Sequence, residues 1–164
     1  MDLVQEILLQ RLTAIEPSDL LCIAPSMPPA VVHWPGAAAG RTTHMDPTVA
    51  LTRLAEFGRC EFALLAGALE ILSAGDGAAL IARLRDIHCH RFVVSYRPGN
   101  EQTGNGGWTE QDFRSLTLSL HHRIEEDGVQ TLIYGYDIDS YNHRRAWNSS
   151  EHWANPGNFS RFRW

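Results

Sequence analysis

The residues of this chain that could carry chemistry are few, and the densest group is His88-Cys89-His90. In an extended segment His88 and His90 point to one side, so together they would offer two ligands to a metal ion. No CxxC or HxxxH spacing lies nearby to complete a site of four ligands. The plainer interpretation is a helix that ends at His88, because the helix dipole favours a histidine there. We therefore predict no metal site.

The sequence also shows no clear nucleophilic site and no clear acid–base pair. The chain lacks a Gly-x-Ser-x-Gly motif, and Cys22 would need a histidine partner that sequence alone does not place. Asp137 and Asp139 fall on one face of a predicted strand, which suits a solvated strand end better than a pair of catalytic carboxylates. All fourteen basic residues are arginine, so lysine chemistry such as a Schiff base is excluded. We predict no catalytic residue.

A strand-helix-strand unit in the middle of the chain must position any site. Residues 62–66 form a short apolar run, as a buried parallel strand does. Apolar residues then recur at helical spacing over 80–87, with Asp76 as the expected cap, and residues 91–97 have the composition of a second strand. Such a unit predicts two parallel strands joined by a right-handed crossover.

The flanking segments extend this pattern. On the N-terminal side we predict a helix over 3–12, strands over 19–24 and 30–34, a loop over 35–44 and a helix that starts at Asp46-Pro47. On the C-terminal side, Thr109 and Asp112 form a capping-box pattern for a helix that runs to Gly128. A strand over 129–138 follows, with Gly135 as a bulge. The order predicts one α/β domain over residues 1–164 with a mostly parallel sheet.

Part of this pattern resembles a known family. Residues 67–98 read GALEILSAGDGAALIARLRDIHCHRFVVSYRP, and two later runs read DFRSLTLSLHHRI and VQTLIYGYDI. These runs resemble the later half of the class I S-adenosylmethionine-dependent methyltransferases, in which a strand leads into a leucine-glutamate turn, a helix and another strand. The resemblance covers roughly residues 59–140 and implies a Rossmann-like, three-layer α/β sandwich. The whole chain also resembles a small proteobacterial family of unknown function, through its Trp-Asn, Trp-Ala-Asn-Pro, Asn-Phe and Arg-Trp ending.

The N-terminal half departs from the methyltransferase pattern. That family needs a glycine-rich loop after its first strand and an acidic residue after its second, to hold the cofactor. Here the first strand runs into Pro25-Ser26-Met27-Pro28-Pro29, and proline removes backbone donors. The expected second strand is followed by Trp34-Pro35-Gly36, without an acid. We expect a reduced cofactor half that binds no S-adenosylmethionine.

A ligand site should lie beyond the carboxyl ends of the first and fourth strands of the methyltransferase-like sheet. This placement selects five candidate binding residues: Ser26, His33, Gly67, Glu70 and Arg97. Glu70 is the strongest because it directly follows a buried strand. Its alternative role is that of a solvent-facing glutamate in the first turn of a helix, which the dipole favours.

The composition of the chain indicates where in the cell the protein is located. Asp2 and Glu6 interrupt the first apolar positions, so no signal peptide is visible, and no apolar run is long enough to span a bilayer. The three cysteines, Cys22, Cys60 and Cys89, are scattered and odd in number, so we expect buried free thiols. These features predict a cytoplasmic protein without a membrane segment.

The last predicted segment, residues 141–164, differs from the rest. Its apolar residues are almost all aromatic, and four arginines against the single acid Glu151 give it a charge of +3, whereas the whole chain carries −5. Aromatic and arginine side chains suit either packing on the domain or a homodimer interface. Nucleic-acid binding is disfavoured because the remainder of the chain is acidic.

Three functions follow from these observations. The first is a degenerate, non-catalytic methyltransferase-like domain that acts by binding or self-association. The second is a small enzyme, a methyltransferase with an atypical cofactor site or a hydrolase. The third is an anion or nucleic-acid binder that uses residues 141–164. We favour the first.

Overall fold

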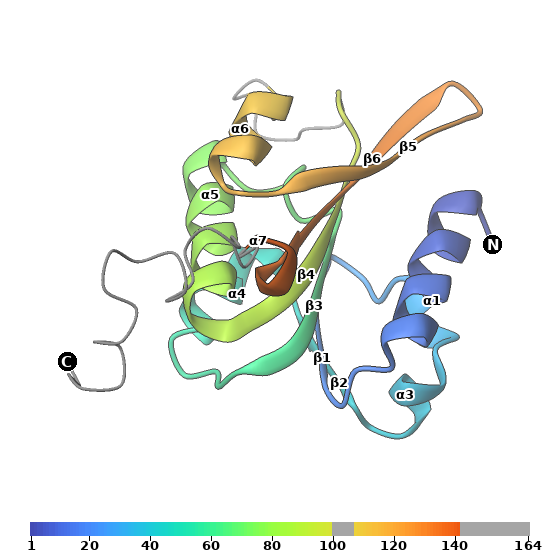
Figure 1. The fold of residues 1–164 in the computed structure, drawn as a ribbon, viewed down its shortest axis with the longest axis vertical. Coiled ribbons are helices and arrows are strands. Elements are labelled where there is room, and N and C mark those ends of the chain that lie inside the picture. The colour runs from blue at the N-terminus through green and yellow to red at the C-terminus, as the bar shows by residue number, and fades with distance from the viewer. Residues whose placement is uncertain (100–106, 142–164) are drawn as a thin grey trace, which may run out of the picture.

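The computed structural model describes residues 1–99 and 107–141, which form a six-stranded sheet with helices on both faces (Figure 1). The strands are β1 (Leu20–Ile23), β2 (Thr42–Met45), β3 (Cys60–Ala66), β4 (Cys89–Tyr96), β5 (Ser119–Glu126) and β6 (Val129–Asp137), in the spatial order β2-β1-β3-β4-β6-β5. Strands β1 to β4 are parallel, and β6 runs antiparallel to both β4 and β5. The predicted α/β class with a mostly parallel sheet is confirmed.

Two layers of helices cover the sheet. Helices α4 (Pro47–Arg53), α5 (Ala74–Arg83) and α6 (Glu110–Ser115) lie on one face, and α5 continues as the π-helix η1 (Leu84–His88). On the other face lie α1 (Leu3–Ile15) and the single-turn helices α2 (Pro29–Val32) and α3 (Pro35–Ala38), whereas the short α7 (Ile138–Tyr141) follows β6. The arrangement is a three-layer sandwich (Figure 1).

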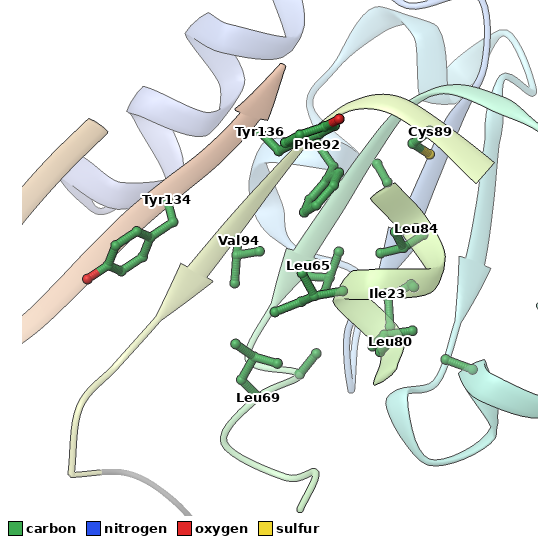
Figure 2. Close-up of a cluster of buried hydrophobic side chains, with 14 of the residues drawn as sticks. Ile23, Leu65, Leu69, Leu80, Leu84, Cys89, Phe92, Val94, Tyr134 and Tyr136 are labelled. Atoms are coloured by element: carbon green, nitrogen blue, oxygen red, sulfur yellow. The ribbon is translucent and has the colours of Figure 1, made fainter. Parts of the chain in front are cut away.

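Each face of the sheet has its own core, because successive strand residues point to opposite faces. Ile23 of β1 and Leu65 of β3 pack with Leu80 of α5 in one core (Figure 2). Their neighbours Cys22 and Leu64 belong to the core beneath α1. Strands buried on both faces explain why β1 and β3 are continuous apolar runs.

Two expectations for residues 30–44 are wrong. Residues 30–34 are not a strand: Pro28 and Pro29 occupy the N-cap and first position of α2, where proline favours a helix over the strand that two valines suggest. The expected loop over 35–44 contains α3 and most of β2, and the true second strand is therefore β2. This strand has four residues and is largely polar because it lies at the edge of the sheet, so it lacks an apolar signal.

The expected helix from Thr109 to Gly128 is also wrong in its second half. The capping box of Thr109 and Asp112 is confirmed, but α6 ends at Ser115 and Thr117 adopts a positive φ of 69°. The chain then forms β5 and turns into β6 through Asp127 and Gly128, whose φ angles are 52° and 76°. An Asp-Gly pair in this conformation is the preferred two-residue hairpin turn. In α5, the N-cap is Ser73, and Asp76 bonds to it from inside the first turn.

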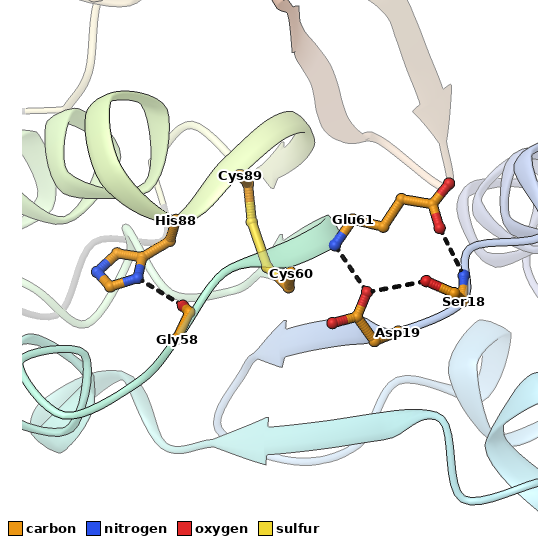
Figure 3. Close-up of a disulfide and its surroundings, with 7 residues drawn as sticks. All are labelled: Ser18, Asp19, Gly58, Cys60, Glu61, His88 and Cys89. Carbon is orange, nitrogen blue, oxygen red and sulfur yellow. Dashed lines mark hydrogen bonds between the residues drawn. A yellow bond between two sulfur atoms is a disulfide. The ribbon is translucent and has the colours of Figure 1, made fainter.

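The amino ends of β3 and β4 are joined covalently. Cys60 and Cys89 are direct register partners with their Cα atoms 5.4 Å apart, and they form a disulfide (Figure 3). The expectation of free thiols is therefore wrong for this pair, because sequence spacing does not reveal strand register. Cys22 remains a buried free thiol, and burial raises its pKa to about 12. The pairing also removes the expectation of free thiols as a reason for the predicted cytoplasmic location.

Further cross-links hold the same end of the sheet. The backbone N–H of Glu61 donates to Asp19 Oδ1 at 2.8 Å, and Glu61 Oε2 accepts from the backbone N–H of Ser18 at 2.7 Å (Figure 3). These bonds tie β1 to β3 at their amino ends. The candidate site lies at the opposite end of the sheet, at the carboxyl ends of the parallel strands.

None of the helices within 1–99 and 107–141 is long and apolar enough to cross a membrane. Residues 142–164, which make up most of the predicted aromatic segment, lie outside the described residues, and so do residues 100–106.

Candidate functional site

A cavity of about 300 Å³ opens at the carboxyl ends of β1, β3 and β4. It lies where β2 and β3 flank β1 on opposite sides, the position at which open parallel sheets bind their ligands. We call it the carboxyl-end cavity. Its wall is half polar and half apolar, and comprises Gln5, Pro25, Ser26, Pro28, Pro29, Ala66, Gly67, Glu70, Ile71, Ser95 and Arg97.

The structure brings four of the five candidate residues together at this cavity: Ser26, Gly67, Glu70 and Arg97. His33 does not line it, because the segment expected to be a strand is a helix, and His33 is its exposed C-cap. Gly67 adopts φ +67°, which L-residues rarely do, in the turn that faces Pro25. The ends of β1, β3 and β4 therefore meet at one cavity, and a ligand there remains a prediction.

Glu70 is buried, with 4% of its surface exposed. Its Oε1 accepts a hydrogen bond from the backbone N–H of Arg97 at 2.8 Å, so it joins the turn after β3 to the end of β4. The alternative of a solvent-facing glutamate is thus wrong. A buried carboxylate is stable only where hydrogen bonds replace its hydration, and the bond to Arg97 supplies one.

Three residues of the cavity region escaped sequence reasoning. Asp2, the N-cap of α1, lies 3.9 Å from the Arg97 guanidinium in an exposed ion pair. Gln5 lines the cavity from α1, and Ser95 lines it from β4. Only Ser95 left a signal, as a polar residue inside the apolar run of β4. The docking of α1 on this end of the sheet is a tertiary contact that no local pattern reveals.

The backbone N–H groups at the start of α2 are already hydrogen-bonded within the chain. Pro28 and Pro29 carry no N–H, and the Ala30 N–H donates to Gln5 Oε1 at 3.1 Å. The N–H groups of Val31 and Val32 both donate to the Pro28 carbonyl, at 2.9 and 3.1 Å. The first turn of this helix therefore satisfies its own donors, with help from α1.

The end of β2 does carry an acid, which corrects the sequence expectation. Asp46 directly follows Met45, because the second strand is β2 and not residues 30–34. Asp46 Oδ1 accepts from the Thr48 N–H at 2.9 Å and caps α4, and its hydrogen bonds with Thr48 lower the pKa of this carboxyl. Nearby, His44 Nε2 donates to the Ala24 carbonyl at 2.8 Å, so the ends of β1 and β2 are bonded to each other.

A serine and a histidine meet elsewhere, on β5. Ser119 Oγ lies 3.2 Å from His121 Nε2, whereas His121 Nδ1 lies 2.6 Å from Arg11 Nη1. Arginine can only donate, so Nδ1 accepts, and the proton of the neutral ring is on Nε2, facing Ser119. This ring cannot take a proton from the serine, since a nucleophilic dyad needs the reverse tautomer. The pair does not support a hydrolase.

Metal ligands do not gather in the described part of the chain: within 1–99 and 107–141 no three His, Cys, Asp or Glu side chains could share an ion. His88 ends η1, as predicted, and its Nδ1 donates to the Gly58 carbonyl at 2.9 Å (Figure 3).

Solved structures with the same fold include methyltransferases. The N-terminal domain of EvdMO1, studied with SAH and D-fucose, has a TM-score of 0.56 at 10% identity, over 81% of this chain and 82% of its own. Magnesium protoporphyrin IX methyltransferase from Synechocystis PCC 6803, with bound SAM, has a TM-score of 0.54 at 13% identity, over 80% and 76%. The bacterial CtHen1 methyltransferase domain has 0.52 at 10% identity, over 82% and 97%. At such identities the likeness shows the fold, and the predicted Rossmann-like, methyltransferase-type architecture is confirmed.

Sequence comparison is less informative about activity. No curated protein matches the chain. A family model matches residues 2–164, and the chain belongs to this family, which is described as a family of unknown function (DUF6231).

Proposed function

We propose that this chain is a methyltransferase-like domain without methyl-transfer activity, which acts by binding a small polar ligand in the carboxyl-end cavity. The observation that carries the proposal is the hydrogen bond from the Ala30 N–H to Gln5 Oε1 behind the two prolines. A cofactor held at the first helix of such a fold needs backbone N–H groups there that are not already hydrogen-bonded within the chain. These residues do not fit that requirement.

The cavity itself supports binding of something smaller. A volume of about 300 Å³ is at the small end of ligand sites. Hydroxyl groups from Ser26 and Ser95, the Glu70 carboxylate and the Arg97 side chain supply both donors and acceptors. Such a wall suits a compact ligand with polar groups of both kinds.

One observation favours a second candidate, a methyltransferase with an atypical cofactor site. Asp46 stands at the end of β2, where the fold family places the acid that binds ribose hydroxyls. Against this, the Asp46 side chain already caps α4, and the loop after β1 remains Pro25-Ser26-Met27-Pro28-Pro29. We rank this candidate second.

Calorimetric titration of the full chain with S-adenosylmethionine and with its product separates the two. We expect no heat of binding for the native chain or for Asp46→Asn. Micromolar binding that is lost in Glu70→Gln, Ser26→Ala or Asp46→Asn would establish the second candidate and overturn the first.

We also propose self-association through residues 141–164, on the grounds of their aromatic and arginine content. Light scattering of the full chain and of a chain ending at residue 140 tests this. A truncated chain that stays folded and has the same number of subunits as the full chain would contradict it.

A further inference from the structure

An arginine and a histidine meet between α1 and β5, on the α1 face of the sheet and away from the carboxyl-end cavity. Strand β5 carries one extra residue at His121, since Leu120 pairs with Tyr134 and His122 with Ile133. This bulge places the His121 ring against Gly135, where any Cβ would overlap it. The expected bulge at Gly135 thus lies on the opposite strand, and the glycine makes room for the ring.

Arg11 of α1 holds the other side of the ring. Its Nη1 donates to His121 Nδ1 at 2.6 Å, and among the described residues this is the one hydrogen bond that the guanidinium makes. A guanidinium has five N–H donors, so the others remain available. Arg11 is partly buried, and burial is the main cause that lowers its pKa, while Asp137 raises it.

Beside this contact lies a second cavity of about 300 Å³, lined by Ile7, Gln10, Arg11 and His122, which we call the α1–β5 cavity. Its polar groups are a guanidinium, an amide and an imidazole, and none is a carboxylate. The carboxylate whose charge acts on both His121 and Arg11 is Asp137, at the end of β6. The wall therefore presents donors and positive charge.

His121 can accept the hydrogen bond from the Arg11 guanidinium only while its ring is neutral. Nδ1 must keep its lone pair to accept from Arg11, so a proton on Nδ1 would place two cations in contact. Burial, then Arg11 and His122, lower the pKa of His121, and Asp137 raises it. In effect, the neutral imidazole nitrogen stands where the oxygen of an anion would bind to Arg11.

We propose that Arg11, His121 and His122 form a binding site for a small oxyanion, such as sulfate or a phosphate monoester, which binds more tightly when His121 is protonated. Protonation breaks the Arg11–His121 bond and frees the guanidinium. It also turns the neighbouring ring into a second cation, so that Arg11 and His121 together outweigh Asp137. The anion then replaces the lost acceptor, and its affinity rises as the pH falls.

Sulfate is the appropriate probe because it keeps its double charge over the pH range in which histidine titrates. The full chain is titrated with sulfate at constant ionic strength, while the His121 and Arg11 side chains are followed by NMR. Because the pKa of His121 is lowered, the titration is done at about pH 7.5 and at about pH 5, the lower value lying well below the ordinary histidine pKa of about 6.5. We expect about tenfold tighter binding at the lower pH, as one added charge at contact distance gives.

Three variants distinguish this site from general attraction of anions to the surface. Arg11→Gln should lose the binding at both pH values, and His121→Ala should lose most of the difference between them. The matched control is Arg123→Gln, which removes an exposed arginine from the same strand and should bind sulfate as the native chain does. Absence of binding, equal native affinity at both pH values, or unchanged binding in Arg11→Gln would overturn the proposal.

Discussion

Gln5 Oε1 on α1 accepts a hydrogen bond from the backbone N–H of Ala30, the only such donor among residues 28–30 at the start of α2. The two residues are 25 positions apart, and their hydrogen bond joins α1 to the segment between β1 and β2. The N-terminal helix thus supplies the acceptor that a bound molecule would otherwise offer. In our proposal, this hydrogen bond is what separates the chain from a methyltransferase that shares its fold.

Replacement of Gln5 by alanine should destabilise the protein. The partly buried Ala30 N–H loses its acceptor, and we expect a loss of about 1 kcal/mol in the free energy of unfolding. Urea denaturation measures it. Gln10→Ala is the control, because Gln10 is an exposed glutamine on the same helix and its replacement should change stability by less than about 0.5 kcal/mol. Equal effects of the two substitutions would show that the contact adds nothing.

Glu70 should matter for stability as well as for the cavity. In Glu70→Ala the partly buried Arg97 N–H loses its acceptor, and we expect a cost of about 1–3 kcal/mol. Glu70→Gln keeps a carbonyl oxygen at the same place and should cost less. Chemical denaturation of both variants checks the order, and a glutamine variant as unstable as the alanine variant would contradict the assigned bond.

The disulfide between Cys60 and Cys89 should stabilise the protein by limiting its unfolded chain. It closes a loop of 29 residues that contains β3 and α5, and the chain-entropy relation gives about 3–4 kcal/mol for this length. The double variant Cys60→Ala/Cys89→Ala should be less stable by about that amount and insensitive to a dithiol reductant. Thiol titration of the denatured native protein should find one group, Cys22, and three would refute the pairing.

His121 should make stability depend on pH. Its pKa is lowered in the folded protein, mainly by burial, so the folded state binds the proton less readily than the unfolded chain does. The stabilisation is therefore complete above the unfolded pKa of about 6.5 and is lost as the pH falls through the folded value. Urea denaturation between about pH 7.5 and pH 5 should show a steeper loss for the native chain than for His121→Gln. His90→Gln, at an exposed histidine of β4, should keep the native slope.

The sequence predicted best where one face or both faces of an element are buried. The strands β1, β3, β4 and β6 were recognisable from apolar runs such as Phe62–Ala66, and the order of these strands led to the fold class. The same strands end at the carboxyl-end cavity, so Ser26, Gly67, Glu70 and Arg97 could be selected without knowledge of side-chain contacts.

The two missed strands share a physical cause, which is exposure at the edges of the sheet. Strands β2 and β5 lie at the two edges and carry few buried side chains, so no apolar alternation marks them. The spacing of Leu116, the C-cap of α6, with Leu120 and Ile124 of β5 resembles a helix by coincidence, and the Asp127-Gly128 turn was the signal that could have corrected it. The contacts of Asp2, Gln5 and Arg11 depend on where α1 docks, which no local pattern encodes.

The most direct test of the central claim is the amide signal of Ala30 in a ¹⁵N NMR spectrum, followed while S-adenosylmethionine is added. Our account predicts that this signal does not move in the native chain, because the Ala30 N–H is already bonded to Gln5. In Gln5→Ala the signal should shift on its own, before any cofactor is added. A native Ala30 signal that shifts with S-adenosylmethionine and saturates at micromolar concentration would contradict the account, because the start of α2 would then be a working cofactor site.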